Sequence, residues 1–184
     1  MHALLDANVL FPTILREILC DLAGNGLFVP VWSQRILGEW RHAAARLGGD
    51  QDAIAGAEIA LLRARFPAAE VAHDGTQAID LDLPDPADRH VIEAAVAGQA
   101  DLIVTANLRD FPGRPMAGLG LRILHPDAFL VALHADHPSP VRDAVERAQI
   151  RAVAAGGSMT VAQMLRRSRL PRLAKAMRVD RNCC

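Results

Sequence analysis

Tyrosine is absent from this 184-residue chain, and aromatic residues of all kinds make up only 4% of it. Cysteine is nearly as scarce, because Cys20 stands alone inside a helical pattern and the other two, Cys183 and Cys184, end the sequence. Three cysteines so placed form neither a disulfide framework nor a zinc-binding spacing. We therefore expect Cys20 to lie in the core and the terminal pair to say nothing about function.

Long apolar runs and targeting signals are also missing. Hydrophobic residues make up 51% of the chain, yet no apolar run approaches the ~20 residues that a membrane span requires. The first residues contain no basic leader region, and Asp6 interrupts the first apolar stretch. These features predict a soluble globular protein of the cytoplasm, with no membrane contact.

Several common site motifs do not occur. There is no GxxxxGK[ST] phosphate loop, and the run from Gly118 to Gly120 does not complete the dinucleotide fingerprint, so nucleotide cofactors are not indicated. None of the seven histidines forms the i, i+4 pair of a helical zinc site. His90 follows Asp88 by two residues and would point elsewhere on a helix, so we do not assign it to a site.

Charge is unevenly distributed, although the net charge is only −1. Residues 1–136 carry 10 Lys and Arg against 18 Asp and Glu, whereas residues 137–184 carry 10 against 3. Such asymmetry indicates two segments with different roles. We predict a main domain over residues 1–136 and a basic helical C-terminal extension over residues 137–184.

The apolar pattern alternates between strand and helix. Short buried runs predict strands near residues 2–6, 28–31, 70–72, 102–105 and 121–124. Amphipathic segments predict helices near residues 12–25, after 33, and near 50–66, 88–97, 141–155 and 160–178. Pro171 is expected to kink or divide the last helix. The alternation predicts an α/β protein with three α/β/α layers around a mainly parallel sheet, followed by the helical extension.

Four acidic residues stand where a predicted strand or loop meets a helix: Asp6, Glu39, Asp88 and Asp110. In open α/β sheets such positions converge beyond the carboxyl ends of the strands. Carboxylates held close together repel one another, and an oxygen-preferring cation such as Mg²⁺ or Mn²⁺ relieves that repulsion. We predict that Asp6, Asp88 and Asp110 bind the metal directly or through water. Glu39 is predicted to bind through water or to position the attacking water.

Neutral polar residues accompany two of these acids. Asn8 follows Asp6 by two residues, and Thr105 and Asn107 come shortly before Asp110. Such side chains are suited to orient carboxylates or backbone around a metal. All three are therefore candidates for a supporting role.

Each acid also has a plainer interpretation. Acids at helix starts commonly cap the helix, and Asp88 alone is as consistent with a cap as with a metal ligand. Asp85 is an alternative for either role, and Glu39 alone is typical of a solvated helix residue. Trp32 and Trp40 are interpreted as core or interface residues. Only the combination of four acids favours a metal site.

Four segments together resemble the PIN domain family and, within it, the VapC-like toxin ribonucleases. They are Leu5-Asp6-Ala7-Asn8-Val9-Leu10, the mid-chain Glu39, Leu83-Pro84-Asp85-Pro86-Ala87-Asp88-Arg89-His90, and Ile103-Val104-Thr105-Ala106-Asn107-Leu108-Arg109-Asp110-Phe111-Pro112. The resemblance implies a Mg²⁺- or Mn²⁺-dependent endoribonuclease that hydrolyses RNA phosphodiesters with metal-activated water. It further implies the toxin of a type II toxin–antitoxin pair, a homodimer silenced by a cognate antitoxin.

Two other functions stay open at this point. One is a catalytically silent PIN-fold module that binds RNA or protein and keeps the acids for stability. The other is a phosphohydrolase of small substrates, although the haloacid-dehalogenase type needs two aspartates two residues apart and Asp6-Ala7-Asn8 supplies one. Because all four acids are present, we favour the enzyme.

Basic residues gather near the C-terminus, beyond the segments that resemble the family. Candidate contacts to RNA phosphates are Arg166, Arg167, Arg169, Arg172 and Lys175. The same segment carries an apolar stripe through which it could pack on the main domain or on a partner. We slightly favour a segment that packs in this way and turns its basic side to RNA over one that only packs. With so few aromatic residues there is no base-reading signature, and the RNA target is not predicted.

Overall fold

The computed structural model describes residues 1–76, 78 and 81–181, with side chains up to residue 178. The chain groups into two compact units, one formed by Met1–Phe11 and Phe28–Leu124 and the other by Pro12–Leu27 and His125–Cys184. This grouping does not follow the division drawn at residue 136 from charge, because two helices from before that point pack with the C-terminal helices. The separate role of residues 137–184 stays a prediction, and Cys183 and Cys184 lie outside the described residues.

The first unit is built on a five-stranded parallel sheet with the order β3-β2-β1-β4-β5. Its strands are β1 (His2–Leu5), β2 (Val29–Ser33), β3 (Glu70–Val71), β4 (Leu102–Val104) and β5 (Arg122–Leu124). In the register, Leu5 of β1 lies opposite Val104 of β4, so the two strands end side by side. The residues that follow them, including Asp6 and Thr105, therefore meet at one edge of the sheet.

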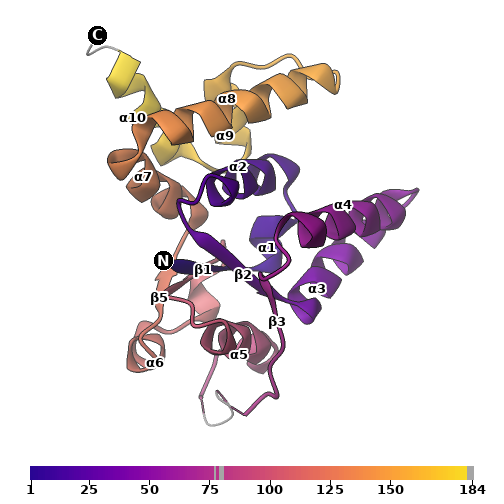
Figure 1. Cartoon of the computed structure of the whole chain (residues 1–184), viewed down its shortest axis with the longest axis vertical. Coiled ribbons are helices and arrows are strands. Elements are labelled where there is room, and N and C mark those ends of the chain that lie inside the picture. Colours follow the sequence, from indigo (N-terminus) through magenta and orange to yellow (C-terminus); the bar gives the residue numbers. More distant parts are fainter. Residues whose placement is uncertain (77, 79–80, 182–184) are drawn as a thin grey trace. The chain divides into compact units, whose positions relative to one another are not determined.

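Helices cover both faces of this sheet. The helices and 3₁₀ turns of the first unit are α1 (Ala7–Leu10), α3 (Gln34–Ala45), α4 (Gln51–Arg65), η1 (Pro86–Asp88), α5 (Arg89–Ala97), η2 (Leu108–Asp110) and α6 (Gly113–Gly118). Given the strand order, the right-handed crossovers usual between parallel strands assign α3 and α4 to one face and α5 and α6 to the other. Figure 1 shows α5 and α6 on the side of the sheet away from α1. The predicted three-layer α/β/α fold is confirmed.

The central strands are apolar at successive positions because both of their faces are covered. Ala3, Leu4 and Leu5 of β1 are 0% exposed, as are the three residues of β4. Short α1 and α6, together with η1 and η2, were not predicted from the sequence. Segments of three to six residues are too short to show a helical period.

Helix α3 begins as its sequence predicts. Ser33 is the N-cap, and its Oγ accepts a hydrogen bond from the backbone N–H of Ile36 at 3.3 Å. The apolar stripe of Ile36, Leu37 and Trp40 is buried. Packing of this stripe fixes the rotation of the helix and leaves Glu39 partly exposed, with 40% of its side chain accessible.

Gly98, which ends α5, lies against β2 so closely that a larger residue does not fit. A Cβ atom at this position would lie 2.4 Å from Cγ1 of Val31. We expect Gly98→Ala to lower the free energy of unfolding by about 1–3 kcal/mol, because the strand or the helix end must shift. Urea unfolding would measure the change. Gly56→Ala in the middle of α4 is the matched control, since its neighbours lie at 3.8 Å or more, and a gain of up to about 1 kcal/mol is expected there.

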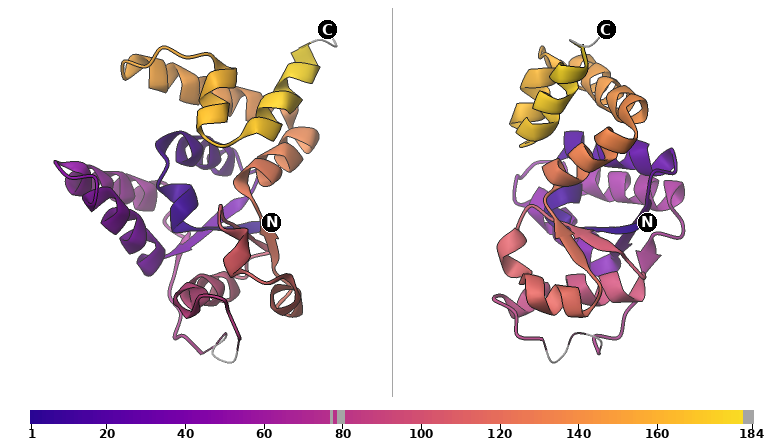
Figure 2. Two further views of the ribbon diagram at one scale, coloured as in Figure 1. Left: turned by 180° about the vertical axis from the view of Figure 1, so that it is seen from behind. Right: turned by 90° about the vertical axis from the view of Figure 1, so that its left-hand side faces the viewer.

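The second unit is entirely helical in its described part. Its helices are α2 (Thr13–Gly24), α7 (Pro126–Asp136), α8 (Pro138–Ala154), α9 (Val161–Arg167) and α10 (Pro171–Arg181). Figures 1 and 2 show α8, α9 and α10, drawn from orange to yellow, close to one another. Pro171 divides the predicted last helix into α9 and α10, as the sequence indicated. Helix α7 was not predicted.

Two kinds of contact hold these helices together. Arg151 of α8 binds Glu17 at 2.8 Å and Asp21 at 3.2 Å, both on α2. The apolar stripe of the C-terminal segment is buried, including Met164, Leu165, Leu170, Leu173 and Met177. Cys20 of α2 is also buried, as predicted. Across the described residues, every helix is too short or too polar to span a membrane.

Candidate functional site

Asp6 lies directly after the central strand β1 and is 7% exposed. Its Oδ1 accepts the backbone N–H of Ala7 at 2.6 Å, so the carboxylate caps α1. Its Oδ2 accepts the Thr105 hydroxyl at 2.7 Å. Burial raises the pKa of Asp6, and the charge of Glu39 adds to this, whereas the hydrogen bonds from Thr105, Ala7 and Asn8 oppose it.

Asn8 and Thr105 tie the ends of the two central strands together around Asp6. The Asn8 side chain donates from Nδ2 to Asp6 Oδ2 at 2.5 Å and accepts the backbone N–H of Ala106 at 2.9 Å through Oδ1. Thr105 follows β4 and is 0% exposed. The orientation of the Asp6 carboxylate is therefore fixed by groups from both strands.

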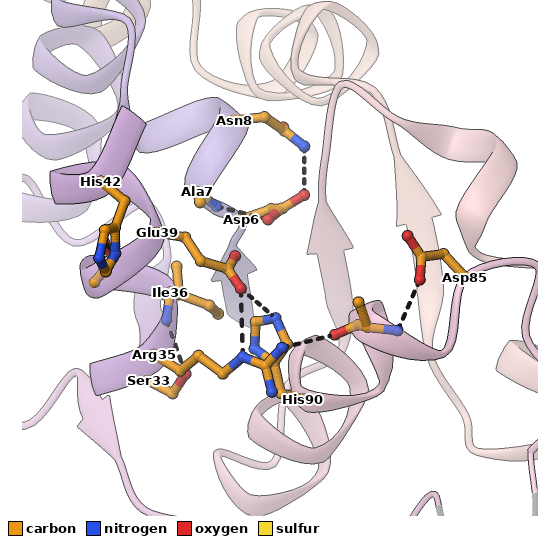
Figure 3. A network of polar contacts seen from close by, with 12 residues as sticks. Asp6, Ala7, Asn8, Ser33, Arg35, Ile36, Glu39, His42, Asp85 and His90 are labelled. Atoms are coloured by element: carbon orange, nitrogen blue, oxygen red, sulfur yellow. Dashed lines mark hydrogen bonds and ion pairs between the residues drawn. The ribbon is translucent and has the colours of Figure 1, made fainter. Parts of the chain in front are cut away.

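Glu39 reaches the same region from α3 and is held by two basic side chains. Its Oε1 lies 2.9 Å from Nε2 of His90 and 3.4 Å from Nε of Arg35. Arg35 also donates to the backbone carbonyl of Ala87 at 3.2 Å, and Figure 3 shows this chain of contacts below Asp6. Partial burial raises the pKa of Glu39, but His90 and Arg35 outweigh it and lower the pKa below its ordinary value.

Asp88 and Asp110 lie near Asp6 and Glu39, and we call these four residues the acidic cluster. Asp88 ends η1 and Asp110 ends η2. Burial, a hydrogen bond with Asp110, and the charges of Asp110, Asp6 and Asp85 raise the pKa of Asp88 to about 6. Two carboxyl groups form such a hydrogen bond only when they share a proton. The side chain of Asn107 donates to Asp110 from the other side.

The structure shows which of Asp85 and Asp88 caps a helix. Asp85 caps η1, because its Oδ1 accepts the backbone N–H of Ala87 at 2.8 Å (Figure 3). Asp88 occupies the N-cap position of α5 but makes no capping hydrogen bond with its side chain. Asp88 thus leaves its carboxyl group to the acidic cluster, and the cap interpretation of Asp88 was wrong.

The donor set of the cluster fits a hard divalent cation. Neighbouring carboxylates raise the pKa of Asp88, which marks a place where positive charge is favoured. Oxygen atoms are the ligands that Mg²⁺ and Mn²⁺ prefer. Within residues 1–76, 78 and 81–181, no three His, Cys, Asp or Glu side chains are already arranged around one metal position. Asp6 is held by Thr105 and Asn8, and Glu39 by His90, so these carboxylates would have to turn toward a bound cation.

Sequence reasoning missed two residues of this site, His90 and Arg35. The His90 ring contacts Glu39 through Nε2, and its side chain is 4% exposed. The decision to leave His90 out was therefore wrong. The i, i+4 spacing of Arg35 and Glu39 on α3 was a usable signal for Arg35.

Comparison with known proteins agrees with this geometry. A family model described as "PIN domain" matches residues 2–109, more than half of the chain. The chain belongs to the PIN domain family. The match contains Asp6, Glu39 and Asp88 and ends one residue before Asp110, whose carboxyl group contacts that of Asp88.

One curated relative is similar to a short stretch of this chain. A protein of Mycobacterium tuberculosis (strain ATCC 25618 / H37Rv), named "Putative ribonuclease VapC50", is 48% identical over 44 residues. The aligned stretch covers 24% of this chain and 26% of the relative, about a quarter of each. No solved structure gives a significant match. The resemblance drawn from the four sequence segments is confirmed.

Proposed function

We propose that this PIN-domain protein is a divalent-metal-dependent endoribonuclease. The observation that carries the proposal is the gathering of acids around Asp88, where burial, a hydrogen bond with Asp110 and the charges of Asp110 and Asp6 raise the pKa of Asp88 to about 6. Such a concentration of negative charge in a PIN fold favours the binding of a cation, and a bound cation in turn favours the binding of a phosphodiester. The name of the partial relative agrees with RNA as the substrate.

The four acidic residues would have two different roles in hydrolysis. Asp6, Asp88 and Asp110 would hold Mg²⁺ or Mn²⁺, directly or through water. The bound ion would polarise a phosphoryl oxygen and lower the pKa of a coordinated water for in-line attack. Glu39 would position that water or accept its proton, and its lowered pKa keeps it ionised for this role at neutral pH.

The neighbouring residues would keep these groups in place. Asn8 and Thr105 would orient Asp6, and Asn107 would orient Asp110, as their contacts indicate. His90 would hold Glu39 at the angle it needs, because its buried ring leaves little freedom. Such supporting contacts commonly contribute 10- to 100-fold to metal affinity or activity.

We also propose that the protein is the toxin of a type II toxin–antitoxin pair in the cytoplasm. A cognate antitoxin would silence it by covering the acidic cluster, and the toxin would act as a homodimer. Family membership supports these partners. The basic side chains Arg166, Arg167, Arg169, Arg172 and Lys175 are all exposed, which supports the proposal that they contact RNA phosphates.

The deciding experiment incubates the purified full-length protein with a labelled cellular RNA pool. Mg²⁺ or Mn²⁺ is expected to produce discrete cuts that disappear in EDTA. Absence of cleavage by folded protein free of antitoxin would contradict the proposal and favour the silent binding module. Hydrolysis of a generic phosphomonoester without RNA cleavage would favour the phosphohydrolase instead.

His90→Ala is expected to slow RNA cleavage about 10- to 100-fold, because Glu39 loses the contact that orients it. His90→Gln retains an N–H donor and is expected to recover part of the rate. Initial cleavage rates of both variants at saturating Mg²⁺ would measure this. Equal rates for Ala and Gln would show that His90 acts only in the packing of α5.

A further inference from the structure

A concave surface that includes Glu39 lies within the first unit. It is a cavity of about 620 Å³ between the first half of α3 and the segment that follows β3. Its lining residues are Ser33, Gln34, Arg35, Gly38, Glu39, His42, Val71, Ala72 and His73. Because Glu39 belongs both to this cavity and to the acidic cluster, the two are continuous.

The lining offers hydrogen-bond donors and planar groups. His42 is fixed to its helix, because its Nδ1 donates to the carbonyl of Gly38 at 2.9 Å, which leaves its ring orientation set. His73 has a buried Nδ1 without a hydrogen-bond partner among the described residues. Arg35 adds a guanidinium group that is already oriented by Glu39 and by Ala87. Figure 3 shows the His42 ring apart from the Glu39–His90 contact.

These groups match the requirements of an unpaired nucleotide. A volume of 300–1,000 Å³ is typical of small-ligand sites, and single-stranded RNA is commonly read by stacking of its bases on aromatic rings, histidine included, or on guanidinium planes. The chain has no tyrosine, and Trp32 and Trp40 are 0% and 2% exposed. The planar side chains that line this cavity are the imidazole rings of His42 and His73 and the guanidinium group of Arg35.

We infer that this cavity binds the base of a nucleotide next to the scissile phosphodiester of single-stranded RNA, with His42 and His73 as its stacking and hydrogen-bonding residues. The inference rests on the proposed ribonuclease function, since the phosphodiester would sit at the acidic cluster. The cavity would then set the preference for the base beside the cut.

The test is a coupled pair of changes, one in the protein and one in the RNA. A labelled single-stranded oligonucleotide that contains a mapped cleavage site is bound to full-length Asp88→Asn protein, with and without His42→Ala/His73→Ala, and binding is measured by fluorescence anisotropy. In a second set of oligonucleotides, each nucleotide beside the cut is replaced in turn by an abasic ribose. His2→Ala, at the opposite end of β1 from Asp6, is the matched histidine control.

We expect the histidine pair and one abasic position each to weaken binding about fivefold or more, the usual effect of one lost base stack. Their combination should weaken binding no further, because both remove the same contact. Additive effects at every position, or intact binding by the histidine variant, would overturn the inference while wild-type cleavage still upholds the ribonuclease. Absence of any wild-type cleavage would instead remove the proposed function. Circular dichroism confirms that each variant is folded.

Discussion

Asp88→Asn is expected to lower the rate of metal-dependent RNA cleavage by about 100- to 1,000-fold, the cost of several kcal/mol of transition-state stabilisation. Asn keeps the shape of the side chain but removes the charge that would hold the cation. Asp88 also makes no capping hydrogen bond that the substitution would break. Cleavage rates at saturating RNA and Mg²⁺ would measure the loss.

The same substitution is expected to stabilise the metal-free protein at neutral pH. The pKa of Asp88 in the folded state is about 6, above its ordinary value of 3.8, so the folded state binds the proton more tightly than the unfolded state. The contribution of Asp88 to the stability of the wild type must then fall as pH rises from 3.8 to about 6. Asp88→Asn lacks this titration, so its free energy of unfolding should rise above that of the wild type across this pH range and stay higher at higher pH.

Asp82→Asn is the matched control for both measurements. Asp82 is exposed and is not among the carboxylates that raise the pKa of Asp88. Its substitution should change neither the cleavage rate nor the pH dependence of stability. Unchanged cleavage by Asp88→Asn would place the active centre elsewhere or expose a contaminating nuclease.

Asp127→Ala is expected to lower the free energy of unfolding of the second unit by about 2–4 kcal/mol. Asp127 of α7 is 3% exposed, and its carboxylate accepts the backbone N–H groups of Arg172 and Leu173 at 2.9 Å each. These are the first N–H groups of α10, and Leu170 before that helix has no side-chain oxygen to cap them. Each buried donor left without a partner costs about 1–3 kcal/mol.

Thermal unfolding followed by circular dichroism would measure this loss. A decrease of about 2–4 °C in Tm is expected per kcal/mol for a chain of this size. Asp136→Ala, in the exposed last turn of the same helix, should be neutral or slightly stabilising, because an acid is unfavourable at a helix C-terminus. Asp127→Asn retains one acceptor oxygen, so its Tm should lie between those of Asp127→Ala and Asp136→Ala. An Asp127→Ala protein as stable as the wild type would show that α10 is capped by other groups.

The elements predicted best were those with a long periodic pattern and a local start signal. Helix α3 is an example, because Ser33 and the stripe of Ile36, Leu37 and Trp40 fix its N-terminus and its buried face. Helix α7 escaped prediction although it is 11 residues long. Its apolar residues are not confined to one side, because Ala128, Val131 and Ala132 surround the buried face of Phe129, Leu130 and Leu133, and such a segment shows no clear amphipathic pattern.

The sequence by itself determined the α/β class, the alternation of strands and helices that gives a mainly parallel sheet, and the four candidate acids, of which Glu39 lies within a helix. Such features are local, because hydrophobic period, cap residues and the positions of Asp6 and Asp88 can be read within a few neighbours along the chain. The tertiary structure alone decided that His90 holds Glu39, that Asp88 meets Asp110, and that Asp127 caps α10. Asp127 and Leu173 are 46 positions apart, and Asp6 and Thr105 are 99 apart. Contacts over such separations depend on strand register and on how helices pack, and neither is encoded in a local pattern.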